Sequence, residues 1–214
     1  TYITNGVYVA LVAGYVSQMI PMSDIAVEAI KIGMILIFTI VNLMGLREVG
    51  KVSTILSVLI LLAFALVAVV GLINWQTNPM EPMLPEDYSI FDGVGGGICI
   101  CVWMYCGYEC ISNMGGEVKN PQVIPKGLMI AMPLVALTYV LPTLGGLACL
   151  PEGSWESWST DGGFDGQAIG YATVLTTYMG QAWGYVFLVI AIVSQCAIFN
   201  TYLASGSRGF FVLA

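Results

Sequence analysis

Glu109 is a carboxylic acid in the middle of an apolar run that is long enough to cross a lipid bilayer. The run covers residues 93–111, and Gly107 lies two residues before the acid. An ionised carboxylate in the hydrocarbon core costs about 2.5–3.5 kcal/mol on insertion scales, so it normally faces a cavity, a partner or a substrate. A nearby glycine lets the backbone leave the helix and expose its polar groups to that cavity. The pair therefore predicts a broken helix with a binding site at the break.

The chemistry expected at such a break is ligand binding rather than catalysis. The half-helix ends near Cys106, Gly107 and Tyr108 would offer unpaired backbone groups and a local dipole to the charged ends of a ligand. Glu109 would hold an ammonium group, or carry a coupled proton if burial raises its pKa towards neutrality. The alternative for Glu109 is a structural acid bonded to a neighbouring helix. Intramembrane acids are functional by default, which favours the first interpretation.

The composition indicates an integral membrane protein. Hydrophobic residues make up 58% of the 214 residues, and charged residues only 9%. A soluble domain carries about 25% charged residues, so this chain lacks the polar surface of a soluble protein. The formal charge of −7 and the absence of a basic patch argue against a nucleic-acid partner.

The sequence predicts no cofactor and no metal site. It contains no histidine, the commonest general base and metal ligand. Its six cysteines lie in apolar runs and form no C-x-x-C element, so we expect them to fill the inner faces of helices. The sequence also lacks H-E-x-x-H and G-x-S-x-G motifs, which argues against a membrane-embedded enzyme.

Six apolar runs approach or exceed the roughly 20 residues needed to cross the hydrocarbon core. They cover residues 2–20, 29–46, 52–75, 93–111, 127–150 and 178–202. We therefore predict an all-α, polytopic transmembrane helix bundle. Acidic loops are expected near 76–92 and 151–167, and the chain is expected to be one partial core, 1–214, of a longer protein.

Charge placement orients the predicted bundle. Basic residues collect on the cytoplasmic side of membrane proteins. If the spans alternate, one side receives Arg47, Lys51, Lys119, Lys126 and Arg208, and the other receives the two acidic loops. We therefore expect the acidic loops outside the cell. Lys31 lies near the outer end of the second run, where we expect it to extend to the interface, although a partnership with an acid inside the bundle is also open.

Three motifs carry a family resemblance. The segments E-V-K-N-P at 117–121 and I-P-K-G-L at 124–128 closely resemble the signature after the sixth helix of amino acid–polyamine–organocation (APC) permeases. N-L-M-G-L at 42–46, with G-K-V after it, resembles the link between helices four and five. W-M-Y-C-G-Y-E at 103–109 resembles the unwound middle of helix six. The resemblance implies helices three to eight of a twelve-helix, LeuT-like fold with a discontinuous sixth helix.

The resemblance also implies roles for single residues. The counterpart of Trp103 in arginine–agmatine and putrescine-type exchangers stacks on the substrate, although Trp103 could equally be ordinary packing. Tyr202 aligns loosely with an aromatic substrate contact on helix eight, but an interfacial tyrosine is the favoured interpretation. Helix one, which grips the substrate in the family, is missing from this sequence. Ile60 stands where one proton-coupled branch has a lysine, so that lysine mechanism does not carry over.

These observations predict secondary active transport of amino acids across the cell membrane by alternating access, with the substrate at the unwound helix. Polyamine uptake of the putrescine or spermidine type, and amino acid/amine exchange, remain alternatives. A further alternative from another class is a non-transporting membrane receptor or assembly subunit, which would not need a broken helix bearing an acid. The expected partners are a small-molecule substrate and the lipid bilayer. Coupling to protons, to sodium or to exchange stays open.

Overall fold

The computed structural model describes residues 5–44, 47–81, 89–108, 120, 122–151 and 166–213. Within these ranges every regular element is a helix and there is no strand, which confirms the predicted all-α class. The helices are α1 (Asn5–Met19), α2 (Asp24–Met44), α3 (Arg47–Ile73), α4 (Ile90–Met104), α6 (Val123–Cys149), α8 (Gly166–Met179) and α9 (Gln181–Leu213).

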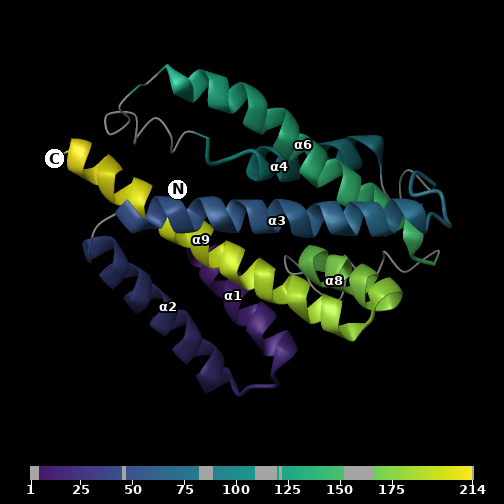
Figure 1. Cartoon of the computed structure of the whole chain (residues 1–214), viewed down its shortest axis with the longest axis horizontal. Coiled ribbons are helices and arrows are strands. Elements are labelled where there is room, and N and C mark those ends of the chain that lie inside the picture. Colours follow the sequence, from purple (N-terminus) through teal and green to yellow (C-terminus); the bar gives the residue numbers. More distant parts are fainter. Residues whose placement is uncertain are drawn as a thin grey trace.

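α3 and α6 run in one direction along the molecule, and α9 runs back in the other (Figure 1). In Figure 1, α3 and α6 begin on the left, and α9 ends there. α9 crosses the molecule diagonally, between α3 and the α1–α2 pair (Figure 1). Three helical stretches are long and apolar enough to cross a membrane: Thr54–Ile73, Val123–Cys149 and Gln181–Ser207. α1 and α4 contain shorter apolar stretches, Asn5–Ser17 and Gly93–Val102.

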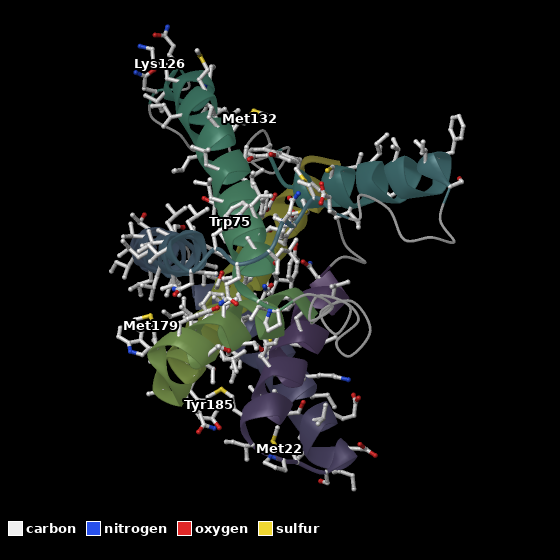
Figure 2. The ribbon with its side chains drawn as sticks, turned by 90° about the vertical axis from the view of Figure 1, so that its right-hand side faces the viewer. Met22, Trp75, Lys126, Met132, Met179 and Tyr185 are labelled. Carbon is white, nitrogen blue, oxygen red and sulfur yellow. The ribbon has the colours of Figure 1, made fainter. Side chains whose placement is uncertain are left out.

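Large apolar side chains on the outer faces of these helices are exposed. Ile73, Met129 and Ile130 have exposed fractions of 77%, 76% and 72%. Figure 2 shows the first half of α6, with Lys126 and Met132, extending away from the other helices. Surfaces of this kind would be unfavourable in water and suit contact with lipid or with other membrane helices. They agree with the membrane class inferred from composition.

α8 was not predicted, and the boundaries of the last span were wrong. Residues 166–179 form a helix of their own, and the last helix begins at Gln181 rather than 178 and continues past 202. The two helices meet at Gly180, whose φ of +96° is readily available only to glycine. The hydroxyls of Thr176 and Thr177 donate to carbonyls one turn earlier, so these polar residues fit a helix without other partners.

Glycine allows the closest helix approach between α3 and α6. A Cβ added to Gly71 would lie 2.5 Å from the carbonyl oxygen of Gly145, so the two backbones touch at this crossing. Small residues allow such contact between membrane helices. The sequence favours the same packing role for the glycines at 93–97, where Gly93 and Gly97 have the small-xxx-small spacing. Among the described residues, nothing lies within 4 Å of a Cβ added at Gly97, so this interpretation is wrong at that glycine.

α9 links the two hydrophobic cores. In the first, Val67, Leu175 and Phe187 pack together from α3, α8 and α9. The second joins α1 and α9 with Met34 of α2. α2 is further tied to α9 by the Asn42 amide, which donates to the buried Asn200 Oδ1 at 2.6 Å.

Lys31 has a partner on its own helix. Its Nζ lies 2.7 Å from Glu28 Oε1, one turn earlier in α2. Both side chains are partly exposed, so the pair lies at the surface of the bundle rather than inside it. Within the described residues, the partner of Lys31 is therefore a surface acid of its own helix and not an acid inside the bundle.

Candidate functional site

The helix ends where the sequence predicted a break. α4 stops at Met104, and residues 105–108 form a turn. Gly107 adopts a φ of +117°, in the left-handed region that L side chains rarely adopt. An apolar run that could have continued as a helix therefore turns at the predicted glycine. The Cys101 carbonyl still accepts from the Tyr105 N–H at 3.0 Å, and the carbonyls after it have no further helical turn to bind them.

Two tyrosine hydroxyls from other helices bind carbonyls at this turn. The Tyr139 hydroxyl, from α6, donates to the carbonyl oxygen of Met104 at 3.2 Å. The Tyr202 hydroxyl, from α9, donates to the carbonyl oxygen of Cys106 over a long 3.4 Å. Carbonyls that leave a helix in an apolar environment need such donors. The two tyrosines therefore connect the turn to α6 and α9.

Aromatic contacts extend this connection to α1. The rings of Tyr8 and Tyr202 stack with centroids 5.5 Å apart and an interplanar angle of 24°. The rings of Tyr105 and Tyr139 meet edge to face with centroids 6.0 Å apart. Rings in these geometries attract each other beyond simple burial. The turn after α4 thus has aromatic support from α1, α6 and α9.

A cavity of about 920 Å³ lies beside the turn. Ile60, Ile100 and Ile190 form part of its apolar wall. None of its described lining residues is charged. Its polar lining residues are Tyr8, Tyr15, Ser57, Thr138, Tyr139, Tyr171, Ser194, Gln195, Thr201 and Tyr202. A mainly apolar cavity with a few polar groups is the usual form of a small-molecule site.

The structure brings part of the predicted site together. Cys106, Gly107 and Tyr202 line the cavity. Tyr108 belongs to the same turn and is half-buried. Trp103 lies in the last turn of α4, but its side chain lies outside the described part, and Glu109 lies outside the described residues altogether.

The expectation for the cysteines is partly wrong. Cys99 and Cys106 line the cavity, in line with an inner face. Cys101 is exposed and is not among the described lining residues, so it does not fill an inner face as predicted. Cys149 is buried and Cys196 half-buried. Cys110 lies outside the described residues.

Comparison with known proteins decides the family. The family model described as amino acid permease matches residues 2–214, almost the whole chain. The chain belongs to the amino acid permease family. This confirms the resemblance found in the sequence, and it places the chain among membrane transporters rather than enzymes.

The permease chain is similar to transporters of several kinds. A probable polyamine transporter of Arabidopsis thaliana is 30% identical over 188 residues, which are 85% of this chain and 34% of that protein. The branched-chain amino acid permease BcaP of Lactococcus lactis is 23% identical over 77% of this chain and 37% of its own. The cadaverine/lysine antiporter of Escherichia coli is 28% identical over 60% of this chain and 30% of its own. The chain therefore spans about a third of the length of these relatives. No solved structure matches it.

Sequence reasoning missed most of the permease cavity wall. Tyr8 and Tyr15 lie seven residues apart on α1, with Leu11 between them on the same face, and all three line the cavity. This helical spacing was visible in the sequence but reads equally well as ordinary core packing. Tyr139 gave no signal, because a single tyrosine in an apolar run does not show which carbonyl it will bind.

Proposed function

We propose that this chain forms part of the core of a secondary active transporter that carries amino acids across the cell membrane by alternating access. The observation that carries the proposal is the end of α4 at a cavity, with Gly107 in a left-handed turn and tyrosines holding the carbonyls of Met104 and Cys106. Transporters build their sites at such interruptions, near the middle of the membrane.

The proposed mechanism uses the turn as the ligand contact. The backbone groups of Cys106, Gly107 and Tyr108 face the charged ends of the substrate, and Tyr202 forms the wall opposite them. Trp103 closes over the ligand from outside. Glu109 holds an ammonium group or carries a coupled proton. A cation over the indole face of Trp103 gains about 0.5–2 kcal/mol, which is weak enough to permit release of the substrate.

Amine transport is the second candidate, and two observations favour it. Curated relatives include a probable polyamine transporter and a cadaverine/lysine antiporter. The stacked rings of Tyr8 and Tyr202, both lining the cavity, offer aromatic faces to a cation. Competition of radiolabelled uptake by putrescine, lysine and leucine distinguishes the candidates. Uptake into vesicles with an imposed proton or sodium gradient identifies the coupling ion.

The Glu109→Gln variant of the full-length protein tests the functional reading of the turn. Glutamine keeps the size but loses the charge and the titratable proton. Losing a charge-assisted contact costs about 1.5–3 kcal/mol, so we expect apparent affinity to fall roughly ten- to a hundredfold. Glu109→Asp should be milder because it keeps the charge. Unchanged uptake of every transported substrate by the Gln variant would make Glu109 a structural acid, and a wild type that binds neither amino acids nor amines would overturn the proposed function.

We further propose that the protein is a multi-pass protein of the cell membrane, with residues 1–214 as a partial core and the loops near 76–92 and 151–167 outside the cell. The common side on which α3 and α6 begin and α9 ends supports this orientation (Figure 1), because these ends carry basic residues. In a cysteine-free background, an impermeant thiol reagent should label a cysteine at Asn78 from outside, but not one at Gln122. The reverse pattern would overturn the orientation.

A further inference from the structure

One face of α6 connects α8 with the turn that ends α4. Tyr139 and Thr143 lie one helical turn apart on α6, so their side chains share a face. The Tyr139 hydroxyl donates to the carbonyl of Met104 at 3.2 Å, at the start of that turn. Thr143 Oγ lies 2.8 Å from the hydroxyl oxygen of Tyr171, on α8. Two residues on one face of α6 therefore contact the turn and α8.

The direction of these hydrogen bonds follows from the single proton of the Thr143 hydroxyl. That hydroxyl donates to the Tyr139 carbonyl at 2.7 Å, so its proton is already used. The Tyr171 hydroxyl is therefore the donor to Thr143. The two bonds form a chain from α8 to the backbone of α6, and chained hydrogen bonds in an apolar environment strengthen one another.

The same turn of α6 is weakened by Pro142. Proline has no N–H, so residue 142 cannot donate to the Thr138 carbonyl as another helical residue would. Helices bend at prolines for this reason. The hydrogen bonds of Thr143 therefore hold the part of α6 that has lost a backbone bond, and Tyr139 belongs to that part.

Tyr171 is itself held in place by two aromatic rings from other helices. Its ring meets Phe64 of α3 edge to face with centroids 5.4 Å apart, and Phe187 of α9 with centroids 6.1 Å apart. Only 6% of Tyr171 is exposed. A tyrosine packed so tightly between α3 and α9 can hold Thr143 at a defined position.

We propose that Tyr171 is a positioning residue for the substrate site. By holding Thr143 it fixes the proline-weakened turn of α6, and this keeps the Tyr139 hydroxyl on the Met104 carbonyl. Loss of the Tyr171 bond lets α6 bend at Pro142 and draws Tyr139 away from the turn that contacts the substrate. The proposal rests on the transport function proposed above and deepens it, because substrate affinity then depends on α8.

The test measures radiolabelled uptake of putrescine, lysine and leucine into vesicles that contain the full-length protein. Thr143→Val is the decisive variant, because Thr143 is not among the described residues that line the cavity. It removes the acceptor for Tyr171 and nearly keeps the shape of the side chain. For each transported substrate we expect the half-saturating concentration to rise about two- to tenfold, the range of one lost hydrogen bond. Thr143→Ser keeps the hydroxyl and should behave like the wild type.

Tyr171→Phe combined with Thr143→Val separates positioning from stability. Thr143→Val takes the acceptor from the buried Tyr171 hydroxyl, so it should also lower the unfolding temperature in detergent. Removing that hydroxyl as well should restore most of the stability, because replacing both partners by apolar groups is nearly neutral. The positioning bond is still absent, so substrate affinity should stay low. A purely structural role predicts instead that affinity recovers together with stability.

Tyr178→Phe is the matched control. Tyr178 lies seven residues after Tyr171 on α8, and its hydroxyl also donates to α6, but to the carbonyl of Cys149 at the helix end. It is not among the described lining residues of the cavity. Its loss should therefore lower stability and leave substrate affinity unchanged. An equal loss of affinity in Tyr178→Phe would overturn the proposal, because it would show a general effect of α8 on stability.

Three other results would overturn the proposal as well. They are unchanged affinity in Thr143→Val, lost affinity in Thr143→Ser, and restored affinity in the double variant. If Thr143→Val does not fold by size-exclusion chromatography, the Ser variant and the double variant still decide. A wild type that takes up none of the three substrates would instead contradict the transport function itself.

Discussion

Gly107→Ala is the most direct test of the turn that ends α4. The glycine has a φ of +117°, where a residue with a side chain is strained by about 1–3 kcal/mol. The new Cβ would also lie 2.5 Å from the Tyr202 hydroxyl oxygen, which must therefore move. Moving it breaks the long hydrogen bond to the Cys106 carbonyl, a loss of about 0.5–1.5 kcal/mol. Together these effects predict a destabilisation of the turn by roughly 2–4 kcal/mol.

The assay is thermal unfolding of the purified full-length protein in detergent, together with substrate uptake in vesicles. We expect a lower unfolding temperature and reduced uptake for Gly107→Ala. Gly97→Ala is the control, because Gly97 lies in α4 and an added Cβ meets nothing within 4 Å. It should be neutral or stabilise the helix by about 0.5–1 kcal/mol, since alanine restricts the unfolded chain more than glycine does.

A double variant separates the backbone strain at residue 107 from the steric contact between the new Cβ and the Tyr202 hydroxyl. Tyr202→Phe removes the hydroxyl, and the nearest remaining ring atom would then be Cζ, 3.4 Å from the new Cβ. The combined Gly107→Ala and Tyr202→Phe variant should therefore be less destabilised than the sum of the single changes, by about 1 kcal/mol. Strict additivity would show that the hydroxyl contact is unimportant. Equal unfolding temperatures and equal uptake for Gly107→Ala and Gly97→Ala would refute the left-handed conformation of Gly107.

Two further predictions concern helix packing. Gly71→Leu should destabilise the bundle by about 1–3 kcal/mol, because the new side chain meets the backbone of Gly145. Gly33→Leu on α2 is the control: an added Cβ there meets nothing within 4 Å, so it should be nearly neutral in the same unfolding assay. Asn200→Leu should destabilise the protein, and a double-mutant cycle with Asn42→Leu should give a coupling of about 0.6–1.7 kcal/mol; no coupling would show that their 2.6 Å contact adds nothing to stability.

The residue types around position 107 made the break at the end of α4 predictable. A glycine and an acid within an apolar run indicate a backbone that leaves the helix, and the structure turns at Gly107 as this pattern requires. The all-α class followed equally well from the lengths of the apolar runs. α8 was missed because its threonines and glycines resemble loop residues. Their hydroxyls bind carbonyls of their own helix, which composition alone does not reveal.

The side chains that bind the carbonyls at the end of α4 could not be predicted from the sequence, because they come from helices distant in the chain. Ending a helix inside a membrane leaves carbonyls that need donors, so the sequence does imply that hydroxyl or amide groups approach the turn. It does not say which of the chain's many tyrosines supplies them. The structure assigns Tyr139 and Tyr202, from α6 and α9. Both helices must therefore keep their positions relative to α4 while these bonds exist. Any movement of the turn during the proposed transport must exchange them for other donors. A substrate ammonium is a donor of that kind, which connects the geometry of the break with the proposed binding of amino acids or amines.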